Sequence, residues 1–127
     1  MTIMGRSIGS GVAIFLASKF RVGNLILVSP FLSLCEVVKD KYCNAFSLLL
    51  EDRFNNRDRI SKVKCPCLII HGLADEIIPY HHSISLNSIV QGFCMLKLVK
   101  DMTHSCFHYY KDFLVHVNEF FYKLDVW

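Results

Sequence analysis

The chain has 127 residues, of which 14 are Lys or Arg and 11 are Asp or Glu, giving a net charge of +3. This length suits one modest domain with a core of its own, and the weak charge, without any run of Lys or Arg, argues against a nucleic-acid-binding protein. Apolar residues make up 53% of the sequence, yet their longest runs, such as 25–28 and 46–50, are too short to cross a bilayer.

The six cysteines follow neither the spacing of a zinc site nor that of a dense disulfide framework. Residues 65–67 form a C-x-C sequence that leads into an apolar run, and we expect the cysteines to be buried thiols in a reducing compartment. We therefore expect no metal site. No signal peptide precedes the first expected strand, so the expected location is the cytoplasm.

Residues 5–9, Gly-Arg-Ser-Ile-Gly, fit the pattern G-x-S-x-G, which is typical of a nucleophile elbow. In such an elbow a serine, here Ser7, lies on a sharp turn between a strand and a helix. Residues 1–4 are expected to be the end of that strand. We expect a β-carbon at Gly5 or at Gly9 to clash, because the strand and helix backbones come close at this turn.

The next element is a predicted helix over residues 8–19. Gly9, Ala13 and Ala17 recur every four positions, so their face can lie close to a sheet. The remaining positions are apolar nearly all round, which predicts that the helix is buried on several sides.

The middle of the chain begins with a strand and continues less regularly. Residues 24–29 are a largely apolar run, which predicts a strand buried on both faces, and Pro30 ends it. Four weaker features follow: a short helix over 34–41, an apolar stretch over 42–50, a turn over 52–56 and a helical turn over 57–63.

The last part of the chain contains a predicted buried strand over 67–72, a helix over 80–90, a strand over 93–99 and an amphipathic helix over 105–124. Strands and helices thus alternate, which is typical of right-handed crossovers between parallel strands. The predicted fold class is α/β, with about four parallel strands and helices on both faces of the sheet.

Three polar residues follow strand ends, where ligands bind in parallel α/β sheets. Ser7 follows the first predicted strand, Asp75 the third and His104 the fourth. Serine is a poor nucleophile at neutral pH unless an imidazole takes its proton and a carboxylate holds the imidazole in the right tautomer. Because the order Ser, Asp, His is that of an elbow-type hydrolase, we predict that these residues form a catalytic triad.

Each candidate has an alternative, and for Ser7 it is a chance match to the G-x-S-x-G pattern. Asp75 suits a turn as well as a catalytic acid, and Glu76 is the nearest substitute for it. His71 falls within a predicted strand and is expected to be a core residue. The remaining histidines are expected to be exposed or to lie on the polar side of a helix, namely His81, His82, His108 and His116.

Three segments, residues 5–11, 27–31 and 65–79, resemble the α/β-hydrolase superfamily. More narrowly, they look like the branch that contains membrane-associated serine hydrolases and protein S-depalmitoylases, and residues 52–56 are similar to a D-x-F-x-N segment of that branch. The similarity extends over nearly the whole chain but corresponds to the C-terminal half of a family domain. We therefore expect residues 1–127 to form a single truncated α/β-hydrolase domain without the N-terminal half of the sheet, with 31–62 as a cap or lid.

The resemblance implies that Ser7 is the nucleophile, Asp75 the triad acid and His104 the base, with no cofactor. It also implies that the N–H of Ile8 is one donor of the oxyanion hole, while the loop that carries the second donor is absent from this sequence. One departure concerns residues 101–104, Asp-Met-Thr-His, because the family usually has glycine before the histidine. Asp and Thr take tight turns less freely than glycine.

The expected function is that of a serine hydrolase acting on ester or thioester bonds of small acyl compounds, lipidated proteins or lipid esters. Phe31 and Leu32, with Phe46 and Leu48–Leu50, are candidates for lining an acyl-chain pocket. Two alternatives stay open: an inactive hydrolase fragment or interaction module, and a serine peptidase on the same fold. The resemblance implies peripheral membrane contact, and an unpaired first strand predicts self-association through residues 1–4 and the first helix.

Overall fold

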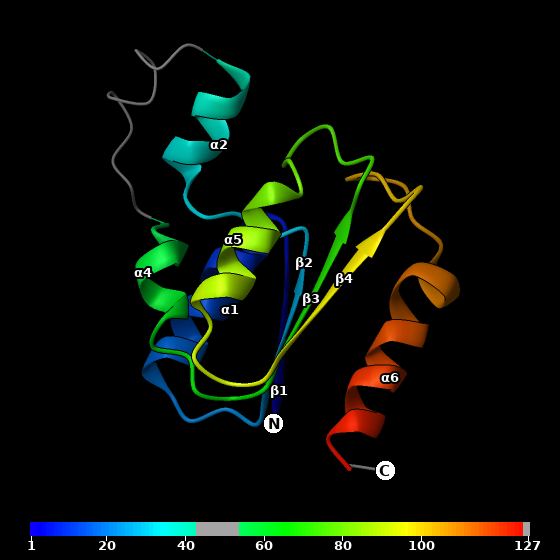
Figure 1. Cartoon of the computed structure of the whole chain (residues 1–127). Coiled ribbons are helices and arrows are strands. Elements are labelled where there is room, and N and C mark those ends of the chain that lie inside the picture. The colour runs from blue at the N-terminus through cyan, green and yellow to red at the C-terminus, as the bar shows by residue number, and fades with distance from the viewer. Residues whose placement is uncertain (43–53, 126–127) are drawn as a thin grey trace.

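The computed structural model describes residues 1–42 and 54–125, which form a four-stranded sheet with helices against both faces (Figure 1). In chain order the elements are β1 (Thr2–Arg6), α1 (Ile8–Lys19), β2 (Asn24–Val28), α2 (Leu34–Lys41), α4 (Asn56–Ile60), β3 (Cys67–Gly72), α5 (His81–Ile89), β4 (Cys94–Val99), the π-helix η1 (Tyr109–Leu114) and α6 (Val115–Lys123). Every predicted strand is present, and its ends lie within two residues of the predicted ones.

All four strands run parallel, in the order β1-β2-β3-β4 across the sheet. Arg6 at the end of β1 is paired with Val28, and Gly72 at the end of β3 is paired with Val99. The carboxyl ends of the strands therefore lie along one edge of the sheet. This arrangement confirms the predicted α/β class with a parallel sheet.

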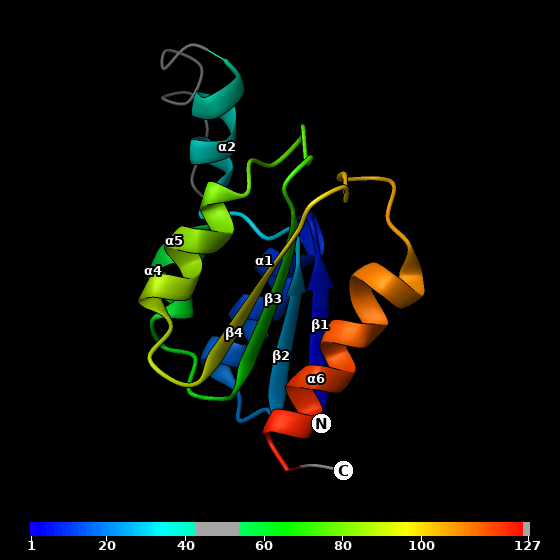
Figure 2. The same cartoon turned by 45° about the vertical axis from the view of Figure 1, so that its right-hand side comes forward.

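The sheet lies between α1, α4 and α5 on one side and α6 on the other (Figure 2). A cluster of buried apolar side chains packs against each face. Leu27 and Ile69 belong to the cluster that α1, α4 and α5 cover, whereas Val28 and Ile70 pack with the side of the sheet that faces α6. β2 and β3 are buried along nearly their whole length, as their continuous apolar runs predict.

The two glycines of the Ser7 turn differ in their surroundings. A β-carbon at Gly5 would lie 2.5 Å from the carbonyl oxygen of Gly9 and 2.6 Å from the β-carbon of Ala13, so the close contact of β1 with α1 requires glycine there. A β-carbon at Gly9 would meet no atom within 4 Å. The expectation of a clash at both positions is therefore wrong for Gly9, which lies on a partly exposed side of the first turn of α1.

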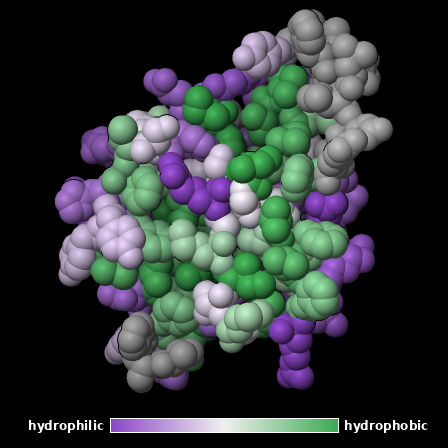
Figure 3. Space-filling view, turned by 180° about the vertical axis from the view of Figure 1, so that it is seen from behind, coloured by the Kyte–Doolittle hydropathy of each residue, from purple (hydrophilic) through white to green (hydrophobic). Residues whose placement is uncertain are grey.

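The outer side of α1 is apolar and exposed. Ile8, Val12 and Phe15 are 56%, 49% and 40% exposed, so the prediction that this helix is buried on several sides is wrong for the described part of the chain. Figure 3 shows the molecule from behind the view of Figure 1, where apolar side chains form a broad area. No helix within residues 1–42 and 54–125 is long and apolar enough to span a membrane.

The final helical segment begins later than predicted. Residues 105–108 precede it as a loop, and the first helical turns, Tyr109–Leu114, have π-helical hydrogen bonding before α6 begins. Phe113 and Phe120 are buried, whereas Tyr110 is 62% exposed although it belongs to the predicted apolar stripe. A π-helix has more residues per turn than an α-helix, so a stripe counted at 3.6 residues per turn does not match its buried side.

The predicted cap region, residues 31–62, is described in part. α2 has the same residue range as the predicted helix over 34–41. It lies beyond the carboxyl ends of the strands (Figure 1). Its first turn is capped by the Ser33 side chain, which accepts a hydrogen bond from the N–H of Glu36. Phe46 and Leu48–Leu50, the other residues expected in an acyl pocket, lie outside the described residues.

The cysteines differ in burial. Cys67 is buried in β3, where a hydrogen bond with Cys94 and burial raise the pKa of its thiol. Cys106 is exposed, so the expectation of buried thiols is wrong for this residue, and Cys43 lies outside the described residues. Within the described residues, Cys65, Cys67, Cys94 and Cys106 form no disulfide.

Candidate active site

Ser7 occupies the turn between β1 and α1 in a backbone conformation that L-residues rarely adopt. Its φ is 51° and its ψ is −123°. Within the described residues, the non-glycine residues with a positive φ are Ser7, Ser29 and Asp125. The N–H of Ser7 donates to the carbonyl of Val28 at 2.9 Å, so the end of β2 holds the turn in place. Strained positions of this kind cluster at functional sites.

Ser7, His104 and Asp75 form one continuous chain of hydrogen bonds. The Oγ of Ser7 lies 2.9 Å from Nε2 of His104, and Nδ1 of His104 lies 2.9 Å from Oδ2 of Asp75. Because Nδ1 faces a carboxylate, it carries the ring proton and leaves the Nε2 lone pair directed at the hydroxyl. The structure thus brings together three side chains that are far apart in the sequence.

The two oxygens of Asp75 have different partners. Oδ1 accepts hydrogen bonds from the N–H groups of Ile77 and Ile78, each at 2.9 Å, while Oδ2 faces His104. Asp75 is therefore a turn residue and a partner of the imidazole at the same time. Glu76, its predicted substitute, is exposed.

His71 is buried, as predicted, but it also contacts the candidate site. Its Nε2 lies 2.8 Å from the carbonyl of Ile78 and 3.4 Å from Oδ2 of Asp75, and its Nδ1 lies 2.6 Å from the Ser83 hydroxyl. Since Nε2 faces two acceptors, it carries the proton, and the Ser83 hydroxyl donates to Nδ1. The sequence signal for the contact of His71 with Asp75 was the position of His71, one residue before the end of a predicted buried strand.

The pKa of Asp75 is held well below its usual range. Burial alone would raise it, but the hydrogen bonds from His71, from the N–H of Ile78 and from His104 together outweigh burial. The carboxyl group is therefore ionised at neutral pH. An ionised Asp75 stabilises the N–H at Nδ1 of His104, and it would stabilise an imidazolium there more strongly.

The loop that carries His104 adopts its conformation without glycine. No residue from Asp101 to His104 has a positive φ. Thr103 closes the loop through three hydrogen bonds with Cys106. Its N–H and its Oγ1 donate to the Cys106 carbonyl at 3.1 and 3.2 Å, and its Oγ1 accepts from the Cys106 N–H at 2.9 Å. The departure from the glycine-containing family pattern is thus compatible with a histidine that reaches Ser7.

Ile8 is the first residue of α1, directly after Ser7. The first N–H groups of a helix have no partner within the helix, and the partial positive charge of the helix N-terminus lies beside them. This position suits the predicted oxyanion donor, whose role stays a prediction.

Phe31 and Leu32 are buried, at 1% and 2% exposure. Leu32 belongs to the core beneath α1, and its N–H donates to Nδ1 of His82 at 3.2 Å. The two side chains therefore pack within the interior of this structure, and their role in substrate binding stays a prediction. His82 is fully buried, so the expectation that it is exposed is wrong.

One group of side chains in the described residues has the spacing of metal ligands. Nε2 of His81 and Nε2 of His82 each lie 2.8 Å from Oδ2 of Asp40. However, Nδ1 of His82 accepts the N–H of Leu32, so the ring proton is on Nε2 and points at Asp40. A metal would bind Nε2 of His82 only without its proton. The proton would then be on Nδ1 and would face the N–H of Leu32, from which Nδ1 otherwise accepts a hydrogen bond. The group fits a hydrogen-bonded junction between α2 and α5 better than a metal site.

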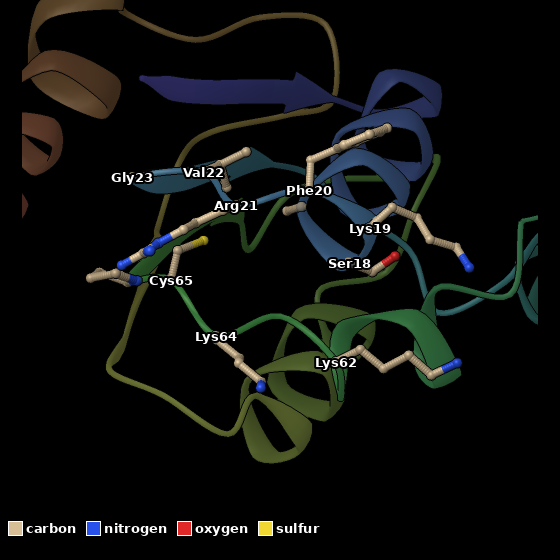
Figure 4. A pocket seen from close by; sticks show the side chains of 11 residues that line it. Ser18, Lys19, Phe20, Arg21, Val22, Gly23, Lys62, Lys64 and Cys65 are labelled. Carbon is tan, nitrogen blue, oxygen red and sulfur yellow. The ribbon is translucent and has the colours of Figure 1, made fainter.

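A hollow of about 570 Å³ lies at the opposite end of the sheet from Ser7, beside the C-terminus of α1 and the segment that leads into β3 (Figure 4). Its lining includes Lys19, Arg21, Lys62 and Lys64. Figure 4 shows Arg21 extending to one side and Lys19 and Lys62 to the other, so these cations do not converge on one ligand position. We do not assign the candidate chemistry to this hollow.

A parallel sheet, a serine at positive φ between strand and helix, and an Asp and a His at later strand ends define the α/β-hydrolase fold. The chain has part of this fold, and two sets of proteins are similar to it, one in sequence and one in structure.

The curated relatives include Alpha/beta hydrolase domain-containing protein 17B of Homo sapiens, which is 39% identical over 88 residues, or 66% of this chain and 28% of the relative. Alpha/beta hydrolase domain-containing protein 17C of Mus musculus is 35% identical over 88 residues, or 25% of that protein. The match thus spans about a quarter of the length of these relatives. No family model matches the sequence.

Solved structures share the fold at low sequence identity. Acetyl xylan esterase 1 from a Thermoanaerobacterium species has a TM-score of 0.71 at 20% identity, over 94% of this chain and 45% of the esterase. An acylaminoacyl peptidase from Pyrococcus horikoshii has a TM-score of 0.75 at 17% identity, over 94% of this chain and 23% of the peptidase. These likenesses, with the sequence relatives, confirm the resemblance to α/β-hydrolases.

Proposed function

We propose that the chain carries the catalytic triad of a serine hydrolase that cleaves ester or thioester bonds. The observation that supports this proposal is the unbroken series of contacts from the Ser7 hydroxyl through His104 to the ionised Asp75. Each contact has the geometry that the assigned role requires.

In the proposed reaction, Nε2 of His104 takes the hydroxyl proton while Oγ of Ser7 attacks the acyl carbonyl. Asp75 holds the resulting imidazolium. His104 then gives its proton to the departing alcohol or thiol, and an acyl group remains on Ser7. Water enters, loses a proton to His104 and attacks the acyl group, which restores the Ser7 hydroxyl and releases an acid.

The developing oxyanion needs hydrogen-bond donors. The N–H of Ile8 at the start of α1 is one candidate. One such donor typically changes the rate by about 10²- to 10³-fold, so a site with a single donor would be slow.

We infer an apolar acyl group as the substrate moiety. The exposed side chains of Ile8 and Ile77, which flank Ser7 and Asp75 in sequence, are 56% and 48% exposed and offer apolar surface near the triad. The resemblance to S-depalmitoylases favours acyl-protein thioesters or lipid esters, with contact to a membrane surface. A peptidase remains the second candidate because peptidases are among the solved structures with this fold.

Labelling with a fluorophosphonate probe tests the triad directly, because the probe reacts only with an activated serine. We expect the full chain to be labelled, and Ser7→Ala and His104→Ala to abolish labelling. Ser18→Ala, in the last turn of α1, is the matched control and should label normally, since the Ser18 Oγ donates an exposed hydrogen bond to the carbonyl of Phe15. Labelling that persists in Ser7→Ala, or a folded chain that does not label, would contradict the proposal.

A second assay separates the substrate classes. The rates at which the unlabelled, probe-reactive chain cleaves acyl thioesters, acyl esters and acyl anilides of equal acyl length are compared. Faster cleavage of thioesters and esters with long acyl groups supports the proposed substrate. Preferential cleavage of anilides would favour a peptidase instead.

A further inference from the structure

His104 has to cross the sheet to reach Ser7. It follows β4, whereas Ser7 follows β1, and β2 and β3 lie between them. Neighbouring strands are 4.7–4.9 Å apart, so the loop after Val99 and the His104 side chain together span roughly 14 Å along the carboxyl edge of the sheet. A loop of this kind needs support at both ends to place an imidazole within hydrogen-bonding distance.

The support near β3 comes from backbone contacts. The N–H of Leu73 donates to the carbonyl of Val99 at 2.9 Å, and the N–H of Ala74 donates to the carbonyl of Met102 at 3.2 Å. Gly72 leaves room for this crossing, since a β-carbon there would lie 1.9 Å from the Met102 carbonyl oxygen. These contacts fix the first half of the loop over the end of β3, short of β1.

The support near β1 comes from Arg6, the residue before the candidate nucleophile. Gly5 faces α1, so Arg6 projects to the opposite face of the sheet. Its Nη2 donates to the carbonyl of His104, and its guanidinium lies over the Phe107 ring at 5.2 Å from the centroid. The Arg6 side chain thus contacts the loop at two positions, His104 and Phe107, and connects both to β1, the strand that ends directly before Ser7.

We propose that Arg6 is a positioning residue that sets the distance between Ser7 Oγ and His104 Nε2. This inference rests on the proposed function and deepens it. Asp75 fixes the other ring nitrogen but lies on the β3 side, so it orients the ring without fixing its approach to β1. The bond from a cation to the His104 carbonyl and the contact with Phe107 supply that second restraint.

Lysine cannot fully replace arginine in this role. The guanidinium is planar, so it can donate to the carbonyl and lie flat over an aromatic ring with the same group. An ammonium on a flexible stem can keep the charge but does not combine the two contacts. We therefore expect the labelling rate of Arg6→Lys to lie between that of the original chain and that of Arg6→Ala.

The experiment compares Arg6→Ala, Arg6→Lys and the control Arg57→Ala, whose side chain bonds Glu36 away from the loop. We expect Arg6→Ala to lower the labelling rate and the kcat of ester cleavage by about 10²-fold with KM nearly unchanged, because a shift of about 1 Å has this effect on positioned groups. Arg6→Lys should recover part of the loss. Arg57→Ala should be unchanged.

Nitrogen-15 NMR of the histidine rings keeps the proposal testable if the chain does not label at all. Arg6→Ala should shift the Nε2 signal of His104 as Ser7→Ala does, while the downfield proton on Nδ1, which reports the bond to Asp75, stays. An unlabelled chain with this response would reject the hydrolase but not the positioning role. Signals and labelling rates like those of the original chain in Arg6→Ala, or equal losses in Arg57→Ala, would overturn the role of Arg6.

Discussion

Asp75 joins two tasks in one carboxylate. Oδ1 closes the turn with Ile77 and Ile78, which fixes the direction of Oδ2 toward His104. His71, from within β3, adds a third restraint from below. The proposed triad acid is therefore held by its own loop and by the sheet.

The lowered pKa of Asp75 predicts a specific pH dependence of stability. In the unfolded chain the pKa of the Asp75 carboxyl is about 3.9, and in the folded chain it is lower. Asp75 therefore contributes stability at pH values above the unfolded pKa, and this contribution is lost as the pH falls through the folded pKa. We expect urea unfolding to give a free-energy difference between the original chain and Asp75→Asn that is largest above about pH 5 and shrinks toward pH 2. Glu76→Gln, at the exposed neighbour, is the control, and an equal response there would contradict this origin.

The same variant tests the tautomer of His104. An asparagine amide would donate to Nδ1, which forces the ring proton to Nε2 and removes the acceptor for the Ser7 hydroxyl. We expect Asp75→Asn to lower the rate of fluorophosphonate labelling on the order of 10⁴-fold. A loss below about tenfold would mean that Ser7 does not depend on this pair.

That Ser7, Asp75 and His104 lie together was predictable because each follows a strand of a parallel sheet, whose ends share one edge. The sequence did not predict the contact of Arg6 with His104, since the partners are 98 positions apart and nothing local marks an arginine as an anchor. The burial of His82 was missed for a related reason. Its position at the start of a helix suggested exposure, but the Leu32 segment covers it.

At the level of elements, strands were easier to predict than the last helix. Residues 24–28 and 67–72 are buried on both faces, and such strands appear in a sequence as continuous apolar runs. The start of the helix after residue 105 was wrong because the chain uses 105–108 in the loop behind His104 and then winds as a π-helix, which apolar spacing does not reveal.

The contact between β1 and α1 predicts opposite effects for two neighbouring glycines. Gly5→Ala places a β-carbon against the backbone of Gly9 and should destabilise the chain by about 1–3 kcal/mol or more. Gly9→Ala meets open space and adds helix propensity, so it should be neutral or stabilise by up to about 1 kcal/mol. Urea denaturation measures both, and equal losses would contradict the packing described for this turn.

Gly72 connects β3 to the loop that crosses above it. A β-carbon at this position would displace the backbone of Met102, which belongs to the His104 loop. We expect Gly72→Ala to reduce labelling of Ser7 by at least about tenfold, because the base is displaced from the hydroxyl. Gly92→Ala, where the nearest atom would be 3.3 Å away, is the control and should keep most of the labelling.

On the scale of the whole molecule, the most unusual property is the apolar side formed by β1 and α1. Among the described strands, β1 pairs with β2 alone, and Met4 within β1 is 53% exposed. An open strand edge next to exposed apolar side chains favours association with another chain.

We therefore predict that the isolated chain self-associates through this side at tens of micromolar, as light scattering or sedimentation velocity would measure. Val12→Lys on the outer side of α1 should weaken association, whereas Ile84→Lys on α5, 44% exposed in the original chain, should not. A monomer for the original chain at these concentrations would contradict the prediction.

The crossing of the histidine loop limits how wide this sheet can be. Five residues, 100–104, separate the end of β4 from His104, and an extended chain covers at most roughly 17 Å over that length. Three steps between strands need roughly 14 Å, but a fourth would need roughly 19 Å. The side chains of His104 and Ser7 and the hydrogen bond between them bridge part of this distance, so an additional strand between β1 and β4 would use up most of the combined reach of backbone and side chains unless the tether also lengthened.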